Sequence, residues 1–179
     1  DPSIAIDKNG TFILTRKGTT SFQGIYSHYS NDNGLTWSSQ RTISTDDIER
    51  ATTATDINPN SSYYGRTYSC WAKLFPPYSI GFSYSNDGAQ NWSPPASLSN
   101  VNLRRAGGEI ALGPNTEVYI CWAGITSVSP FTEVNVGCAS ASDGGADWNI
   151  NENAFAMNGI VGIIAEKQSI RVNGLPRIA

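Results

Sequence analysis

The chain has 179 residues, of which 39% are hydrophobic and 15% charged, and it carries a net charge of −3. This length suits one folded domain, and the proportion of apolar residues excludes wholesale disorder. The acidic balance argues against nucleic acid as a partner, because phosphate binding needs a basic face. No apolar run approaches the roughly 20 residues of a membrane-spanning helix, so we expect no membrane span.

Short strands separated by turns are predicted along the whole chain. In chain order, alternating or β-branched runs predict strands at residues 3–7, 11–15, 24–30, 52–56, 67–72, 80–85, 108–112, 117–123 and 134–140. The most apolar run, at residues 160–164, is predicted to be a further buried strand. No stretch has sustained helical periodicity, so the fold class predicted is all-β.

A motif ending in tryptophan occurs three times, at residues 30–37, 85–92 and 141–148. Its tryptophans, Trp37, Trp92 and Trp148, are 55 and then 56 residues apart. A fixed period of this size indicates a repeat architecture. Each repeat has a small-residue strand, a second strand, a third leading into the motif, and a fourth that we expect to begin at the tryptophan. Four antiparallel strands per repeat predict a β-propeller blade.

The repeats divide the chain into a first blade at about 1–49, a second at about 50–105 and a third at about 106–165. A fourth is expected to start within 166–179, because Leu175-Pro176-Arg177-Ile178 resembles Asp1-Pro2-Ser3-Ile4. Closed propellers have about 4 to 8 blades. We therefore expect part of a propeller, six-bladed when complete, and a fragment of a larger protein. Either further blades or a second copy of the chain would complete the ring.

The tryptophan motif resembles the Asp-box of sialidases and related BNR-repeat propellers, Ser-x-Asp-x-Gly-x-x-Trp. The matching residues are Ser30, Asp32, Gly34 and Trp37 in the first copy, Ser85, Asp87 and Trp92 in the second, and Asp143, Gly145 and Trp148 in the third. Ala89 replaces the glycine of the second copy, and Ala141 replaces the serine of the third. The resemblance implies a structural motif on the face opposite the active site.

Elementary turn chemistry agrees with a structural role for these motifs. Aspartates at hairpin turns accept backbone N–H bonds, glycines supply positive φ, and tryptophans bury large surfaces. The alternative is that the aspartates bind metal or act catalytically. We expect neither a metal nor a cofactor.

Candidate ligand-binding and catalytic residues are expected at the opposite end of the blades, in the fourth-to-first and second-to-third connections. The ligand-binding candidates are Arg50, Arg104, Arg105, Arg177, Phe75 and Tyr78, and the catalytic candidates are Asp46, Asp47, Glu49 and Glu109. Glu166, Lys167 and Arg171 belong to the last such connection. Guanidinium groups bind carboxylates in a bidentate way, so converging arginines would hold an acidic sugar. The alternative is that these arginines are solvated loop or channel residues.

Sialidases, which the chain resembles, use an arginine triad, an aspartate acid/base and a tyrosine paired with a glutamate. The first blade lacks the arginine expected at its start, and no Tyr–Glu pair is assignable, although Tyr119 and Glu109 share a blade. Two functions stay open. One is an extracellular propeller module, secreted or on the cell surface, whose partner is a glycan or another extracellular protein. The other is a sialidase-type glycoside hydrolase whose remaining catalytic residues lie in blades outside this chain.

The three cysteines are too few for a disulfide framework. Cys70 and Cys121 both stand in a Cys-Trp-Ala step and are expected to be buried thiols. Cys121 and Cys138 would face each other across a hairpin centred near Ser129, and bridging them would require an oxidising compartment. His28, the single histidine, is expected at the surface.

Overall fold

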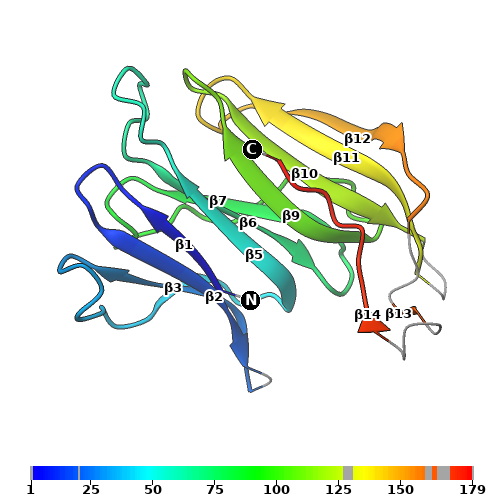
Figure 1. The fold of residues 1–179 in the computed structure, drawn as a ribbon, viewed down its shortest axis with the longest axis horizontal. Helices are drawn as coiled ribbons and strands as arrows, with labels where there is room; N and C mark the ends of the chain where they lie inside the picture. Colours follow the sequence, from blue (N-terminus) through cyan, green and yellow to red (C-terminus); the bar gives the residue numbers. More distant parts are fainter. Residues whose placement is uncertain (1, 20, 127–130, 160–162, 165–169, 179) are drawn as a thin grey trace.

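The structure, a computed structural model, describes residues 2–19, 21–126, 131–159, 163–164 and 170–178, and in these ranges it contains strands and no helix. Three four-stranded antiparallel sheets follow one another along the chain, each a meander in which sequential strands are neighbours. Figure 1 shows them side by side as three blades. The prediction of an all-β fold made of four-stranded antiparallel blades is therefore confirmed.

Each blade runs from an inner to an outer strand in chain order. The first blade contains β1 (Pro2–Ile6), β2 (Phe12–Thr19), β3 (Phe22–Ser30) and β4 (Arg41–Ser44). The second contains β5 (Ile48–Thr55), β6 (Thr67–Lys73), β7 (Ile80–Ser85) and β8 (Ala96–Ser97). The third contains β9 (Arg105–Leu112), β10 (Val118–Ile125), β11 (Glu133–Ala141) and β12 (Asn149–Ala156).

A small two-stranded sheet, β13 (Ile163–Ile164) with β14 (Ile170–Arg171), follows the third blade. The buried strand predicted at residues 160–164 lies mostly outside the described residues, since only its last two positions are described. No helix in the described part of the chain is long and apolar enough to cross a membrane.

The prediction that each fourth strand begins at the tryptophan is wrong for the first two blades. β4 begins at Arg41 and β8 at Ala96, four residues after the respective tryptophan. In the third blade the prediction is confirmed, because β12 begins directly after Trp148.

The delay in the first two blades has a cause in the residue that follows the tryptophan, which is a serine in both. Tyr29 N donates to Ser38 Oγ at 3.0 Å, and Tyr84 N donates to Ser93 Oγ at 3.1 Å. A side-chain hydroxyl therefore accepts the bond that a strand carbonyl would otherwise accept. Regular pairing of the fourth strand begins only after this point.

Two of the inner strands begin earlier than predicted. β5 starts at Ile48 and β9 at Arg105, rather than at residues 52 and 108. As a result, Arg50 and Arg105 belong to inner strands and not to the connections between blades. Each of these strands contains a bulge, which separates its first residues from the run of small residues that the sequence pattern identified.

The blades pack face to face through two apolar clusters. One joins the first two blades and includes Ile25, Ile48 and Trp71. The other joins the second and third blades and includes Phe82 and Trp122. Burial of these faces is what holds successive blades together, because a single four-stranded sheet would leave both of its faces in water.

The two central tryptophans depend on glycines in the neighbouring strands. Trp71 and Trp122 are fully buried, and Gly81 and Gly137 are opposite them in the next strand. A Cβ at either glycine would lie within 2.3 Å of the indole nitrogen. These two positions therefore need glycine.

The inner strands β1, β5 and β9 lie side by side along the middle of the molecule (Figure 1). Side chains link them in sequence: Thr53 N donates to Ser3 Oγ at 3.1 Å, and Thr52 Oγ1 donates to Gly108 O at 2.9 Å. This packing brings the starts of the inner strands together at one end of the blades.

The C-terminal segment, residues 172–178, continues this order by running along β9 (Figure 1). Arg177 Nη1 donates to Glu109 Oε2 at 2.8 Å, and Gly174 N donates to Glu133 Oε2 at 2.8 Å. The segment therefore occupies the place that a further inner strand would take.

Strand register shows which inner-strand residues are equivalent. Ser3, Thr52 and Glu109 each pair with the fourth residue of the second strand of their blade. Because Arg177 binds Glu109, the C-terminal segment meets the third blade at the level of Ser3 and Thr52 in the first two.

Candidate functional site

The first tryptophan motif forms a hairpin turn closed by its own side chains. Ser30 Oγ donates to Asp32 Oδ1 at 2.7 Å and accepts from Gly34 N at 2.9 Å. Asp32 Oδ1 also accepts from Thr36 N at 2.9 Å, and Trp37 Nε1 donates to Gly34 O at 3.1 Å. The polar groups of Ser30 and Asp32 are thus hydrogen-bonded within the turn itself.

The second and third turns repeat this pattern with the substitutions that the sequence contains. Ser85 Oγ donates to Asp87 Oδ1 at 2.8 Å and accepts from Ala89 N at 3.0 Å. In the third turn, Asp143 accepts from Ala146 N at 2.9 Å, and no serine is present at the first position of the motif. The aspartate is therefore the constant polar group of the turn.

Backbone conformation is also shared among the three turns. Each has two consecutive residues with positive φ, which are Asn33 and Gly34, Gly88 and Ala89, and Gly144 and Gly145. Ala89 thus keeps the left-handed conformation of the glycine that it replaces, with a φ of 67°.

The three motif aspartates are held in the ionised form. Hydrogen bonds from the side chain and backbone of Thr36 lower the pKa of Asp32 to about 2. Burial raises the pKa of Asp87, but hydrogen bonds within its turn outweigh burial and the net shift is downward. The backbone N–H of Asp147 lowers the pKa of Asp143. Carboxylates saturated in this way suit a turn and are poor general acids.

These motifs share one end of the blades with the first-to-second turns, as predicted. Arg66, which precedes β6, lies between the rings of Tyr63 and Tyr84, 4.1 and 4.2 Å from their centroids. It also donates to Asn86 Oδ1 at 2.7 Å and to Gly144 O at 3.1 Å. One guanidinium therefore joins the tryptophan motifs of the second and third blades.

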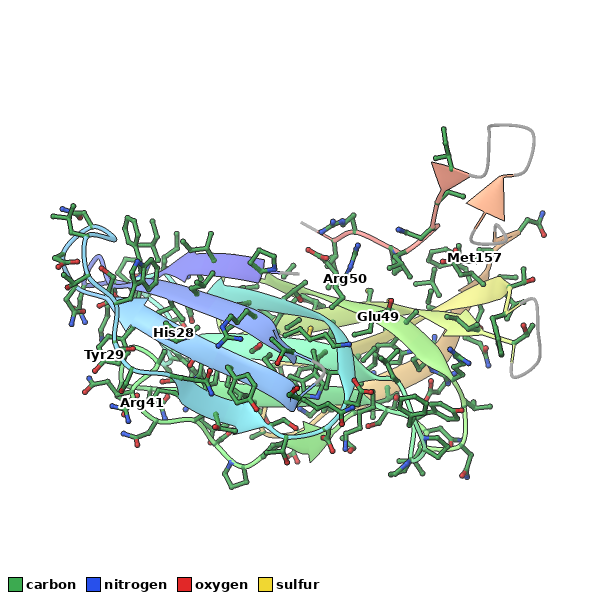
Figure 2. All side chains as sticks on the ribbon, turned by 90° about the horizontal axis from the view of Figure 1, so that it is seen from below. His28, Tyr29, Arg41, Glu49, Arg50 and Met157 are labelled. Carbon is green, nitrogen blue, oxygen red and sulfur yellow. The ribbon has the colours of Figure 1, made fainter. Side chains whose placement is uncertain are left out.

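A cavity of about 260 Å³ opens at the opposite end, where the inner strands begin. It is lined by Pro2, Ser3, Arg50, Ala51, Thr52, Glu109 and Arg177. Figure 2 shows Arg50 next to the C-terminal segment, on the side of the molecule that the inner strands line. The structure thus brings three of the candidates predicted from the sequence, Arg50, Arg177 and Glu109, to one cavity.

Arg50 reaches the cavity at the bulge in β5. The register with β6 shifts between Glu49 and Ala51, and the φ of Arg50 is 44°, in the left-handed region. The bulge in β9 holds Gly107, with a φ of 57°. A left-handed backbone is costly for a residue with a side chain and is enriched at functional sites. The bulge position that is a glycine in β9 is therefore an arginine in β5, and both residues have a left-handed backbone.

Of the two arginines that line the cavity, Arg50 is the one available to bind a ligand. Arg177, whose side chain is 69% exposed, is paired with Glu109, whose side chain is only 18% exposed. The Arg50 guanidinium has no hydrogen bond or ion pair with any other described residue. Two guanidinium groups and one carboxylate give the cavity a net positive charge, which favours an anionic ligand.

The other two candidate arginines do not join Arg50, so the convergence of all four arginines, one of the two alternatives that the sequence left open, is not formed. Arg105 is 5% exposed and pairs with Glu152 of β12, its Nε donating to Glu152 Oε2 at 3.1 Å. Arg104 lies over the Phe131 ring, 4.3 Å from its centroid. Both arginines are therefore committed to contacts within the third blade.

Three of the candidate carboxylates lie outside the cavity. Asp46 pairs with Lys73 at 2.9 Å, and Asp47 pairs with Lys17 at 3.5 Å. Glu49 precedes the bulge in β5 but does not line the cavity. Glu109 is therefore the one member of the four catalytic candidates that lines it.

The aromatic candidates lie outside the cavity as well. Phe75 is exposed in the connection between β6 and β7, and neither it nor Tyr78 lines the cavity. Tyr119 lines a different cavity, of about 610 Å³, which Glu109 does not line. Tyr119 and Glu109 therefore share a blade but not a cavity, in agreement with the absence of an assignable Tyr–Glu pair in the sequence.

Two further groups of candidates are placed as follows. Glu166 and Lys167 lie outside the described residues, as does the side chain of Arg171. His28 is half-buried rather than fully at the surface, and its Nδ1 lies 3.1 Å from Ser38 O. Figure 2 shows His28 among the strands of the first blade, away from Arg50.

Sequence reasoning missed the small residues of the cavity, which are Pro2, Ser3, Ala51 and Thr52. Aligning the repeats on their second strands would have found two of them. The Cys-Trp-Ala steps at residues 70–72 and 121–123 fix the register that makes Thr52 equivalent to Glu109, and the same alignment extends to Ser3.

No protein-family model matches the sequence, and no curated protein matches it either. Solved structures are similar in fold. The intramolecular trans-sialidase from Ruminococcus gnavus, in complex with oseltamivir carboxylate, has a TM-score of 0.52 at 19% identity over 74% of this chain and 27% of its own. A protein of unknown function from Dyadobacter fermentans has a TM-score of 0.61 at 14% identity, over 89% and 51%.

The α-L-arabinofuranosidase Arb93A from Fusarium graminearum, in complex with an iminosugar inhibitor, has a TM-score of 0.61 at 10% identity over 88% of this chain and 48% of its own. The chain thus spans between about a quarter and a half of these three structures. At these identities the likeness concerns the fold. The chain has the blade fold of the β-propellers found in sialidases and other glycoside hydrolases.

Proposed function

We propose that this protein is a propeller module that binds glycans bearing a carboxylate, such as sialosides or uronates, without hydrolysing them. The observation that carries this proposal is the free guanidinium of Arg50 in the cavity at the starts of the inner strands. A secreted or cell-surface location, where such glycans occur, is part of the same proposal. So is completion of the propeller ring by further blades or by a second copy of the chain.

The chemistry of Arg50 supports an acidic ligand. A guanidinium presents paired donors that match the two oxygens of a carboxylate, and a partly enclosed site strengthens that bond. Arg177 adds a second positive charge, and Glu109, held by Arg177, supplies an acceptor for sugar hydroxyl groups. The left-handed backbone conformation of Arg50 is less stable than the extended one, and strained residues of this kind cluster at functional sites.

The composition of the cavity favours binding over hydrolysis. Glycosidases generally need two carboxyl groups about 5–9.5 Å apart, and sialidases replace one of them with a tyrosine. Among the described residues that line this cavity, Glu109 is the single carboxylate, and none is a tyrosine. Glu109 is also engaged by Arg177, whose Nη1 lies 2.8 Å from Glu109 Oε2.

A sialidase-type hydrolase is the second candidate, and the likeness in fold to a trans-sialidase favours it. The chain spans 27% of that structure, so the hydrolase proposal assigns the remaining catalytic residues to other blades. Fluorogenic sialosides distinguish the two candidates. Turnover by the full-length protein that is lost in Glu109→Gln would support hydrolysis and overturn the binding proposal.

Binding is tested by calorimetric titration with the methyl glycoside of N-acetylneuraminic acid and with its carboxamide analogue. We expect the acid to bind and the carboxamide to bind at least ten times more weakly, since a charge-assisted bond is worth about 1.5–3 kcal/mol. Arg50→Ala should remove the preference for the acid, and Arg50→Lys should restore part of it.

The matched control is Arg104→Ala, which alters an arginine outside the cavity and should bind as the wild type does. Equal affinity for the acid and the carboxamide would contradict the proposal. An equal loss in Arg104→Ala and Arg50→Ala would show that general positive charge, and not the cavity, attracts the ligand.

A further inference from the structure

Two of the three cysteines are direct neighbours on adjoining strands. Cys121 of β10 and Cys138 of β11 are opposite each other in the antiparallel register, and both are half-buried and free. Directly opposed residues in antiparallel strands have Cα atoms about 4.5–5.5 Å apart. A disulfide spans Cα separations of about 4.4–6.8 Å, so this pair can be bridged without changing the register.

The side chains of a cross-strand pair lie on the same face of the sheet, so the two thiols are neighbours. Burial, followed by the neighbouring Cys138 thiol, raises the pKa of Cys121 to about 12, which lowers its thiolate fraction at neutral pH and slows exchange without changing the equilibrium. Cys121 is also the cross-strand neighbour of Glu109 on its other side, so β10 joins the cysteine pair to the cavity wall. A bond between Cys121 and Cys138 would fix the strand next to the one that carries Glu109.

The third cysteine provides an internal contrast. Cys70 is fully buried, as predicted, whereas Cys121 was expected to be buried and is only half-buried. The cross-strand neighbours of Cys70 are Thr52 and Phe82, and its Sγ lies 3.2 Å from Thr52 Oγ1. Cys70 has neither a cysteine opposite it nor access to solvent. Oxidation should therefore join Cys121 to Cys138 and leave Cys70 as a free thiol.

We infer that Cys121 and Cys138 form a redox modification site, which closes to a cross-strand disulfide when a small-molecule disulfide is present. One thiolate attacks the small disulfide, forming a mixed disulfide and releasing one thiol. The second thiolate attacks the mixed disulfide and releases the other thiol. Both protein protons leave with the thiols, so one small disulfide is reduced to two thiols as the protein pair is oxidised. An oxidising compartment keeps the bond closed, and a reducing one opens it.

The test uses the whole chain, purified in reductant and then equilibrated with oxidised glutathione. After alkylation in denaturant, we expect the wild type to have lost two hydrogens and to carry one alkyl group, on Cys70. Proteolysis after Glu133, which separates the pair in sequence, should yield two peptides joined by a disulfide. Cys70→Ser should form the same bond. Cys121→Ser and Cys138→Ser should form no intramolecular bond.

The stability of the oxidised form completes the test. A bond compatible with the native register should raise the thermal midpoint of the wild type by about 5–10 °C over the reduced form and leave Cys121→Ser unchanged by oxidant. Three free thiols after equilibration, a bond involving Cys70, or a bond that lowers the midpoint would each overturn the inference. The glycan titration does not depend on this bond, so the two proposals fail separately.

Discussion

Asp32 is an example of how the turn of a tryptophan motif stabilises a negative charge. Asp32 accepts bonds from Thr36 and Ser30, and these hold its pKa near 2, against an ordinary value of 3.8. A carboxylate whose pKa is lowered on folding contributes stability above its unfolded pKa. That contribution is lost as the pH falls through the folded pKa.

We predict that the stability contributed by Asp32 declines between about pH 4 and pH 2. Asp32→Asn should therefore lower the midpoint of urea unfolding at pH 6 and have a smaller effect at pH 2. Thr36→Val removes the largest cause of the shift and should reproduce part of this change, whereas Thr36→Ser keeps the hydroxyl and should not. The measurement is urea unfolding across this range of pH. A loss that is the same at pH 6 and pH 2 would contradict the assignment.

Between the blades, the tryptophans of the second and third motifs belong to the interface with the preceding blade. Trp92 donates to Ser27 Oγ of the first blade at 2.8 Å, and Trp148 meets Phe82 of the second blade edge-on, with centroids 4.9 Å apart. Trp37 has no earlier blade among the described residues, and it is 40% exposed. The three tryptophans are therefore equivalent in sequence and unequal in burial.

Truncation of the tryptophans should reveal this inequality. Trp92→Ala and Trp148→Ala should each lower the free energy of unfolding by about 2–4 kcal/mol, because each leaves a void between two blades. Trp37→Ala should cost about 1 kcal/mol or less, since much of its ring has no partner to lose. Denaturant unfolding of the three variants measures this difference. Equal losses would show that the tryptophans act within their own turns and not between blades.

These elements could be predicted from the sequence where a feature repeats, and not where it depends on register. The tryptophan period predicted the four-stranded blades, and the alternation of strand direction predicted the two ends of the blades. The bulge at Arg50 and the pairing of Arg105 with Glu152 could not be predicted, because both depend on which residues face each other across strands. A bulge changes that register by one residue without changing the local pattern of apolar residues.

Over the whole molecule, the two ends of the blades differ in chemistry. The end with the tryptophan motifs is tied together by Arg66 and the turn bonds. The other end holds the cavity, whose walls come from β1, β5, β9 and the C-terminal segment. Because four separate segments build it, the cavity depends on the packing of the blades and not on any single loop.

The first blade exposes several apolar residues. Ile4, Ile6 and Leu35 are exposed, as is part of Trp37. The second and third blades bury apolar side chains against their neighbours in the two clusters. This difference explains why the first tryptophan motif contributes less to the interior than the other two.

In the proposed function, Arg50 binds the carboxylate of a glycan at the starts of the inner strands. The most direct measurement is a crystal structure of the protein soaked with the methyl glycoside of N-acetylneuraminic acid. We predict that the sugar carboxylate lies against the Arg50 guanidinium with two hydrogen bonds of about 2.7–2.9 Å. A sugar bound at the end that carries the tryptophan motifs, or a cavity left empty at saturating sugar, would contradict this prediction.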